Sequence, residues 1–148
     1  MIEQFFAAYA KSDLRGAPKV VDLGQRGYTD TDAPYLSVIN LASVRDLERV
    51  VGRTVDPMRF RGNLLVDGLE PWVEMGWVGR TLTIGGATLR VEEIIGRCAA
   101  TNVDPATGQR DLTIPHDLQR GFGHTDCGIY VRVTGPGRVA VGDPLNAG

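Results

Sequence analysis

The sequence predicts a mainly β protein with a few short helices, that is, an α+β fold. Two observations carry this prediction. From residue 60 onward, apolar and polar residues alternate in short runs that are bounded by glycine or proline, as is typical of β-strands. Glycine is also abundant, at 19 of 148 residues, or about 13%, which is nearly twice the average usage. Many strands need many tight turns, and glycine supplies them.

Length and composition predict one soluble domain without disulfides. The chain has 148 residues, of which 43% are hydrophobic, enough to build a core. The net charge of −2 lacks the basic excess of nucleic-acid-binding proteins, and no apolar run approaches the roughly 18 residues of a membrane span. We therefore expect neither nucleic acid nor membrane as a partner. The start MIEQFFAAYAK has no basic segment of a signal peptide, so we expect reduced thiols and a cytoplasmic location.

Two helices are predicted. Residues 2–12 carry apolar side chains at helical intervals, and Gly16 and Pro18 follow as stop signals. Residues 40–52 (NLASVRDLERVVG) form the clearer helix, with Ser43 as N-cap, Asp46 three residues later and Gly52 as the C-terminal stop. The apolar faces of these helices are formed by Ile2, Phe5, Phe6 and Tyr9, and by Val44, Leu47, Val50 and Val51.

Five segments read as strands: 35–39, 63–68, 80–96, 128–135 and 138–145. Gly85-Gly86 predicts a type I′ hairpin, whose two central residues both need positive φ. Gly135-Pro136-Gly137 predicts a similar connection between the last two strands. Residues 97–127 form a long polar segment without a strand pattern, and a loop of this length is usually functional or disordered.

Cys98 is the first candidate for chemistry, because it opens that long loop directly after Arg97. A neighbouring guanidinium favours the thiolate, which acts as a nucleophile or as a ligand of soft metals. The alternative is structural, since free cysteines often behave as small buried hydrophobes. Cys127 has the same two interpretations. Cys98, His116, His124 and Cys127 also permit a zinc site or a cysteine hydrolase, although their spacing fits neither well.

Two further segments are candidates for binding. Arg59, Arg61 and Asn63 would share one face of an extended chain and suit a phosphate, although they would equally suit a solvated edge. No glycine-rich phosphate loop accompanies them. Residues 101–108 read as a turn that Asp104-Pro105 begins and Gly108 closes, with Thr101 or Asn102 capping backbone groups. Trp72 and Trp77 are predicted to be core or half-buried anchors.

Together, four blocks resemble the MOSC domain, the molybdenum cofactor sulfurase C-terminal domain, in the order found in that family. They are RFRGNLLVDG (59–68), WVEMGWVGRTLTIGGATLRV (72–91), RCAATNVDPATG (97–108) and GIYVRVTGPGRVAVGDPL (128–145). Within the family, the pattern is similar to bacterial relatives of the mitochondrial amidoxime-reducing component. The resemblance divides the chain into an N-terminal helix and loop (1–34) and a MOSC domain (35–148).

The resemblance implies a MOSC-type β-barrel, with the strand at Gly128 beside the strand that ends at Gly96, and it implies the molybdenum cofactor. Cys98 matches the thiolate ligand of molybdenum, and Arg61 and Asn63 match residues that cradle the pterin and its phosphate. The remaining pocket candidates are Arg59, Arg97, Thr101 and Asp104. The family's proline in the first block is Gly62 here, and its E-D-x-W sequence is Glu74-Met75-Gly76-Trp77.

The implied activity is a molybdenum-dependent oxidoreductase, or part of one, that reduces N-hydroxylated or N-oxygenated compounds with electrons from a separate electron-transfer partner. Two alternatives stay open. One is a sulfur-carrier module that holds a persulfide on Cys98 and receives it from a sulfur donor. The other is a non-catalytic fragment that keeps the fold without the amino-terminal β-barrel domain of cofactor-binding relatives.

Overall fold

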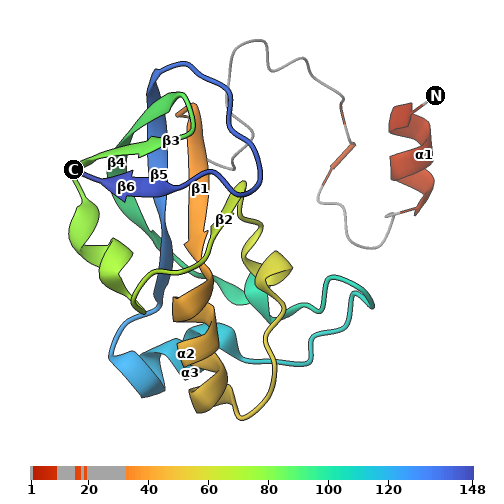
Figure 1. Ribbon diagram of the computed structural model, residues 1–148. Helices are drawn as coiled ribbons and strands as arrows, with labels where there is room; N and C mark the ends of the chain where they lie inside the picture. Colours follow the sequence, from red (N-terminus) through yellow and green to blue (C-terminus); the bar gives the residue numbers. More distant parts are fainter. Residues whose placement is uncertain (1, 10–15, 18, 20–32) are drawn as a thin grey trace.

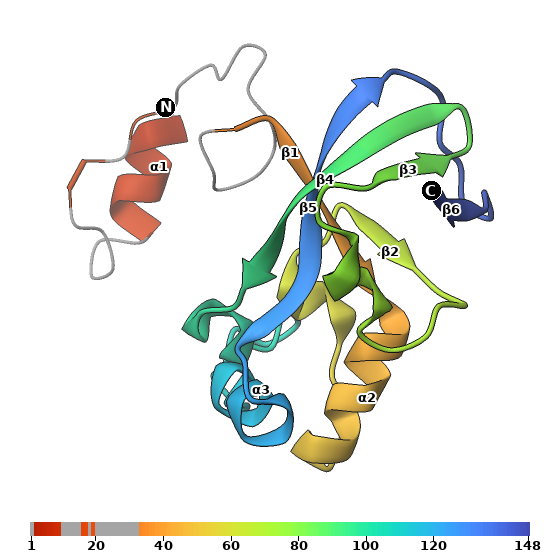
Figure 2. The same ribbon diagram turned by 90° about the vertical axis from the view of Figure 1, so that its left-hand side faces the viewer.

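A curled six-stranded β-sheet forms the centre of the protein (Figure 1). The structure is a computed structural model that describes residues 2–9, 16–17, 19 and 33–148. The strand order is β2-β1-β5-β4-β3-β6; β1 and β2 are parallel, and all other neighbours are antiparallel. The predicted mainly β fold is confirmed, as a half-barrel whose edge strands are β2 and β6 (Figure 2). The strands are β1 (Tyr35–Asn40), β2 (Leu64–Val66), β3 (Thr81–Ile84), β4 (Ala87–Gly96), β5 (Asp126–Gly135) and β6 (Leu145–Ala147).

Short helices connect the strands. The α-helices are α1 (Ile2–Tyr9), α2 (Leu41–Val51) and α3 (Ile114–Phe122), and the 3-10 helices are η1 (Pro57–Phe60), η2 (Val73–Trp77) and η3 (Ala99–Asn102). Helices α2 and α3 lie side by side at one end of the sheet (Figures 1 and 2). Neither these helices nor α1 has the length and hydropathy of a membrane span.

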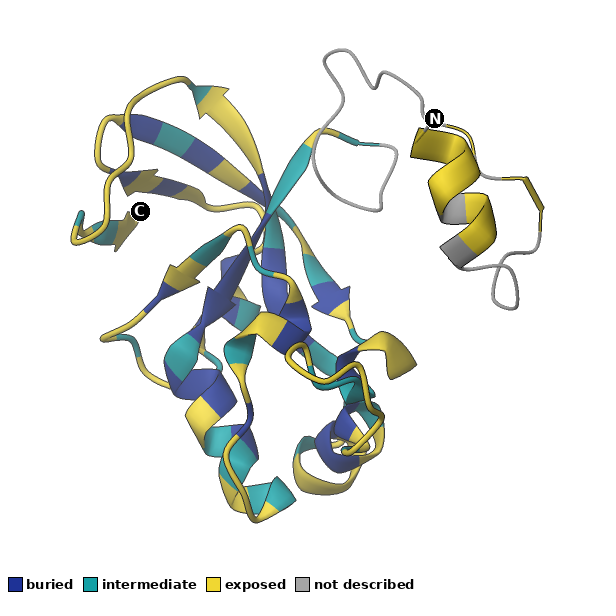
Figure 3. Cartoon of the chain, turned by 90° about the vertical axis from the view of Figure 1, so that its right-hand side faces the viewer, coloured by how far each residue is buried: buried dark blue, intermediate teal, exposed yellow. Residues whose placement is uncertain are grey.

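Two hydrophobic clusters lie on opposite faces of β1, because successive side chains of a strand point to opposite faces. Buried residues are dark blue in Figure 3. Val38 belongs to the first cluster and Ile39 to the second. The first cluster also includes Trp77, Leu82, Leu89, Val91, Ile129 and Val131. The second joins the end of the sheet to α2 and α3 through Val44, Leu47, Val55, Phe60, Ile114, Leu118 and Cys127. As predicted, Trp77 is a core residue and Trp72 is half-buried.

The N-cap of α2 differs from the prediction. Asn40, the last residue of β1, caps the helix by accepting a hydrogen bond from the backbone N–H of Ala42 at 2.9 Å. Ser43 lies inside the first turn, and its hydroxyl donates to the buried carboxylate of Glu74 at 2.7 Å. The prediction failed because β1 runs directly into α2, so the cap lies three residues earlier. Glu74 also accepts a hydrogen bond from the Asn40 amide at 2.8 Å, so this carboxylate ties η2 to α2.

Helix α1 confirms the predicted N-terminal helix over residues 2–9, while residues 10–12 and Pro18 lie outside the described residues. Of the apolar side chains predicted to form its buried face, Ile2 is 59% and Phe5 61% exposed, and those of Phe6 and Tyr9 lie outside the described part of the chain. The second predicted helix is confirmed, with Gly52 as its C-cap.

Two predicted connections are wrong in detail. The Gly85-Gly86 hairpin forms, but only Gly85 has a positive φ, so its turn is not type I′. Residues 138–144 of the predicted strand 138–145 are not a strand, and the last strand, β6, pairs with β3 instead of β5. The chain after Gly137 crosses the tip of the β3–β4 hairpin, where the N–H of Gly86 donates to the carbonyl of Arg138 at 3.0 Å. That contact directs the C-terminal segment to the far edge of the sheet.

The segment 97–127 contains more structure than predicted, since η3 and α3 lie within it. Helix α3 starts at Ile114-Pro115 and ends at Gly123, which has a positive φ of 79°. Ile114 and Leu118, four residues apart, are fully buried in the second cluster. These helix signals were present in the sequence but were outweighed by the polarity of the surrounding residues.

The two cysteines are predicted to differ in reactivity. Burial raises the pKa of the Cys127 thiol to about 12, whereas Cys98 is exposed. Because the thiolate is the reactive form, we expect iodoacetamide at about pH 8 to label Cys98 in native, metal-free protein and to spare Cys127 until the chain is unfolded. Peptide mass mapping measures this, and native labelling of both thiols at equal rates would contradict the packing of Cys127.

Candidate functional site

Cys98 lies where β4 ends, at a cavity of about 230 Å³. As the resemblance implied, β5 returns beside β4, with Gly96 opposite Asp126. The cavity is lined by residues of β1, η1, β4, η3 and β5, and Cys98 is exposed beside it. Segments that are about 60 residues apart in the sequence, from Ser37 to Cys98, therefore meet at this thiol.

Arg97 joins the segments around the cavity. Its Nε donates to the carbonyl of Cys127 at 2.7 Å, and its Nη1 donates to the carbonyl of Phe60 at 3.0 Å. The guanidinium also lies over the Phe60 ring, 5.3 Å from its centroid. The sequence suggested that Arg97 acts on the Cys98 thiol. In the structure, its guanidinium donates to backbone carbonyls of η1 and β5.

Gly128 leaves the space that Arg97 occupies. It has a φ of +84°, and a Cβ there would lie 2.6 Å from the carbonyl oxygen of Val38 and 3.1 Å from Nη2 of Arg97. Glycine is therefore required at this position by both the backbone conformation and the close approach of β1.

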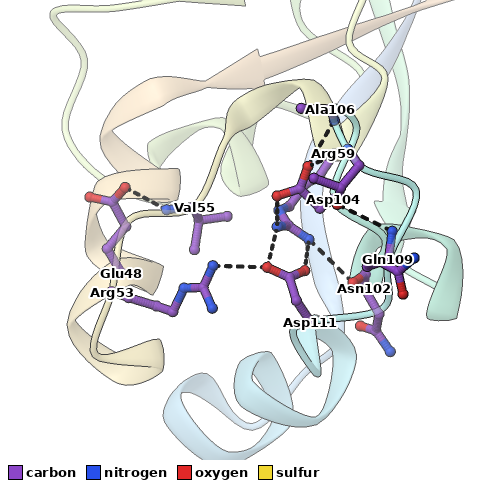
Figure 4. Close-up of polar contacts among 10 residues, drawn as sticks. Glu48, Arg53, Val55, Arg59, Asn102, Asp104, Ala106, Gln109 and Asp111 are labelled. Carbon is purple, nitrogen blue, oxygen red and sulfur yellow. Dashed lines mark hydrogen bonds and ion pairs between the residues drawn. The ribbon is translucent and has the colours of Figure 1, made fainter.

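Arg59 is a buried structural residue as well as a lining residue of the cavity (Figure 4). Its side chain is 2% exposed and forms a two-pronged ion pair with Asp111, at 2.8 and 3.0 Å. It also donates to the carbonyl of Asn102 at 3.2 Å and lies 3.5 Å from Asp104. The Arg59 guanidinium holds the pKa of the Asp111 carboxyl below its ordinary value. Arg53 contacts the same carboxylate at 2.8 Å.

The prediction that Arg59, Arg61 and Asn63 alternate along an extended chain is wrong, because the chain is not extended there. Arg59 lies in η1, and Arg61 ends that helix in a left-handed conformation with φ of 51°. The turn buries the guanidinium of Arg59 and exposes that of Arg61. Within the part of the chain that the structure describes, no hydrogen bond or ion pair holds the Arg61 side chain, which lines the cavity.

Asn63 fixes the wall of the cavity that β1 provides. Its side-chain oxygen accepts hydrogen bonds from the backbone N–H and the hydroxyl of Ser37, at 2.8 and 2.9 Å. Gly62 precedes it, at the position of the family's proline. A Cβ at Gly62 would lie 2.5 Å from Cγ1 of Ile39, so close packing on β1 favours glycine here.

Thr101 and Asp104 shape the loop after Cys98, and the predicted turn at 101–108 is confirmed. The buried hydroxyl of Thr101 donates to the Cys98 carbonyl at 2.9 Å. Asp104 accepts hydrogen bonds from the N–H groups of Ala106 and Thr107 at 2.8 and 3.0 Å. Asn102 caps the distant start of α3 by accepting from the N–H of Ile114 at 2.7 Å.

The groups considered for zinc binding or hydrolysis are not assembled. Cys127 lies in the second hydrophobic cluster, and His116 is exposed on α3. The His124 ring packs against Trp72 and Phe122 and accepts a hydrogen bond from the N–H of Asp126 at 3.1 Å. Over residues 2–9, 16–17, 19 and 33–148, no three His, Cys, Asp or Glu side chains are grouped to hold a metal ion.

Three residues at or around the site were not predicted from the sequence: Ser37, Asp111 and Tyr130. Ser37 and Tyr130 are opposite each other on β1 and β5, and both line the cavity. Their strands were predicted, but no local motif distinguishes them from other strand residues. Asp111 is 52 residues from its partner Arg59, and only the fold brings the two together.

Comparison with known proteins identifies the family. A family model described as the MOSC domain matches residues 25–146. Mitochondrial amidoxime-reducing component 1 of Homo sapiens is 29% identical over 133 residues, which cover 82% of this chain and 38% of that protein. Molybdenum cofactor sulfurase of Caenorhabditis elegans is 36% identical over 107 residues, which cover 70% of this chain and 15% of that protein. The chain thus spans less than two fifths of the length of these relatives.

Solved structures share the fold. YiiM from Geobacillus stearothermophilus has a TM-score of 0.57 at 21% identity, covering 76% of this chain and 53% of that chain. The YuaD protein from Bacillus subtilis has a TM-score of 0.55 at 17% identity, covering 76% and 62%. With the match of the family model over residues 25–146, these findings show that the chain belongs to the MOSC domain family.

Proposed function

We propose that the Cys98 cavity binds the molybdenum cofactor, and that the chain is a reductase of N-hydroxylated or N-oxygenated compounds or part of one. The observation that carries the proposal is an exposed thiol at a cavity that also presents the guanidinium of Arg61, which pairs with no residue in the described part of the chain. The name of one relative, molybdenum cofactor sulfurase, mentions the same cofactor, and the name of another, amidoxime-reducing component, mentions reduction of an N-hydroxylated compound.

The residues present fit this group chemically. A thiolate suits a soft, high-valent metal, which makes Cys98 the protein ligand. Arg61 supplies a cation for the phosphate of the pterin, and guanidinium groups bind phosphate through two parallel hydrogen bonds. Nε of Arg59 is buried, has no hydrogen-bond partner among residues 2–9, 16–17, 19 and 33–148, and belongs to a residue that lines the cavity, so it is a further donor for a ligand.

When bound, the cofactor would supply two-electron chemistry that removes oxygen from the substrate as water, with both electrons coming from a separate carrier and two protons from solvent. The protein's contribution is to hold Cys98 in place. Thr101 fixes the carbonyl of Cys98, and the Arg59–Asp111 ion pair anchors the loop that follows. Arg97, Asn63, Arg59 and Asp104 act in this account as positioning residues, and rigid support of this kind keeps a metal ligand in productive geometry.

The ligand role of Cys98 predicts a loss of cofactor in Cys98→Ser. We expect wild-type protein from a host that makes the cofactor to contain molybdenum and pterin, and Cys98→Ser to contain molybdenum at background level, because a hydroxyl is a poor ligand for a soft metal. Elemental mass spectrometry and pterin fluorescence measure both. Cys127→Ala is the matched control and should keep its molybdenum, since that thiol is buried elsewhere. Equal molybdenum in wild type and Cys98→Ser would refute the assignment.

Arg61 is predicted to hold the cofactor through charge. We expect Arg61→Ala to lose bound pterin about tenfold faster on dilution than wild type, as for the removal of a charge-assisted hydrogen bond. Added salt should accelerate loss from wild type more than from the variant. Arg80→Ala, at another exposed arginine, is the control. If both variants release pterin at the wild-type rate, Arg61 does not contact the cofactor.

A second candidate function is sulfur transfer, favoured by the exposure of Cys98 and by the similarity to molybdenum cofactor sulfurase. The Cys98 thiolate would attack the outer sulfur of a donor persulfide, forming Cys98–S–SH and releasing the donor thiol without net oxidation. Incubation of metal-free protein with a persulfide donor distinguishes the functions. A mass increase of one sulfur atom on Cys98, removed by a reductant, would support transfer, and no increase would exclude it.

A further inference from the structure

The half-barrel is open between its two edge strands, β2 and β6, which lie on the same side of the molecule (Figure 2). Among the described residues, β2 pairs only with β1, and β6 pairs only with β3. An edge strand presents unpaired backbone N–H and C=O groups, which another extended chain can bind. Neither edge strand contains the charged residue or proline that usually blocks such pairing, since their sequences are LLV and LNA.

A groove of about 860 Å³ lies between these two edges, and we call it the edge groove. It is lined by all three residues of β2, by Leu145 of β6 and by the segment 139–144 that precedes β6. Val66 and Ile84 line the groove and also belong to the first hydrophobic cluster. A molecule in the edge groove would therefore extend the core of the half-barrel.

Large apolar side chains are exposed at the edge groove. Leu65, Val139 and Val141 are all exposed, and all three line it. Single exposed apolar residues are common and need no explanation, whereas a group of them at one concave surface is typical of a binding site. The lining therefore favours an occupant with apolar side chains.

The charged residues of the edge groove are acidic. Asp67 and Asp143 line it, and none of the lining residues that the structure describes is a lysine, arginine or histidine. The N–H of Ala140 donates to Asp143 at 2.8 Å, which holds that carboxylate in place. Asp67 pairs with Arg45, but both side chains are more than half exposed, and an ion pair is weak in such a position. An occupant with positive charge is therefore favoured.

The directions of the two edges define how one strand could join them. β1 and β2 are parallel, whereas the pairings from β1 through β5, β4 and β3 to β6 are all antiparallel. These four reversals restore the original direction, so β2 and β6 both run parallel to β1. One extended segment that runs opposite to both edges would form antiparallel ladders with both. Its successive side chains would point alternately toward the first cluster and toward solvent.

We propose that the edge groove binds an extended segment of a partner protein, which is apolar at alternate positions and basic at the positions between, and which joins β2 to β6 as an antiparallel strand. Addition of a strand to an exposed sheet edge is a recurring mode of peptide recognition. The inference does not depend on the proposed function, because the edge groove and the Cys98 cavity share no described lining residue. The competing occupant is a second copy of this chain.

The test uses the full chain and a fluorescent peptide, acetyl-KVKVKVK-amide. Anisotropy measures binding, and hydrogen exchange followed by NMR measures the protection of backbone amides. We expect saturable binding and slower exchange in both β2 and β6 when the peptide is present. The same peptide N-methylated at its valines should bind about tenfold more weakly, because it loses the donors that face one edge. The acidic peptide acetyl-EVEVEVE-amide should also bind about tenfold more weakly.

Variants of the edge groove locate the binding. We expect Leu65→Lys to weaken the KVKVKVK peptide about tenfold, because it adds a like charge to the groove. Val141→Lys serves the same purpose if Leu65→Lys does not fold, as judged by circular dichroism. Val78→Lys, at an exposed position outside the groove, is the matched control and should bind as wild type does. Asp143→Asn keeps an acceptor for Ala140 but removes the charge, so it should weaken binding about threefold at low salt.

No saturable binding of the KVKVKVK peptide up to about 1 mM would overturn the inference, as would slower exchange at only one of the two edges. Wild-type affinity in both lysine variants would also overturn it, since the peptide would then bind elsewhere. A dimer in light scattering, with β2 and β6 amides protected before peptide is added, would overturn it and identify a second copy as the occupant. None of these outcomes bears on molybdenum content, which tests the proposed function separately.

Discussion

The guanidinium of Arg97 holds together three segments on which the whole site depends. It extends from the end of β4 to the carbonyl of Cys127 on β5 and to the carbonyl of Phe60 at the end of η1. Cys98 is the next residue, so its position is set by how Arg97 is bound. The absence of a side chain at Gly128 makes room for this arrangement. The chemistry proposed for Cys98 thus relies on a contact made by its neighbour.

The arginines around the cavity divide into two kinds, and burial explains the division. A buried guanidinium must be paired, because an isolated buried charge is very unfavourable. Arg59 meets this requirement through Asp111, which the sheet and the two helices bring within 2.8 Å. Arg61, two residues later, is turned outward by the left-handed end of η1 and keeps its charge for a ligand. One short turn therefore supplies both an internal anchor and an external cation.

Much of the fold was predictable because alternation and glycine-bounded runs mark strands independently of tertiary context. β1, β3, β4 and β5 follow from such patterns. The errors arise where a tertiary contact overrides a local signal. Asn40 caps α2 in place of Ser43 because β1 runs directly into the helix, which leaves the Ser43 hydroxyl to bond Glu74. The C-terminal segment leaves the expected hairpin to cross the β3–β4 turn.

At the site, Cys98 and Arg61 could be recognised from a local block of sequence, and the structure places them at one cavity. Tyr130 and Asp111 could not, because each acquires its place from residues that lie far away in the chain. Asn63 illustrates the intermediate case. It was identified as a candidate for the cofactor, yet its side-chain oxygen accepts two hydrogen bonds from Ser37 and so fixes the wall of the cavity.

Coordination of molybdenum by Cys98 is the central claim, and X-ray absorption at the molybdenum edge tests it most directly. The protein is loaded with cofactor, and the sulfur neighbours of the metal are compared between wild type and a Cys98→Ser sample reconstituted with excess cofactor. The account predicts one more sulfur neighbour in wild type than in the variant, because the thiolate is a direct ligand. An identical sulfur shell in both samples would contradict it.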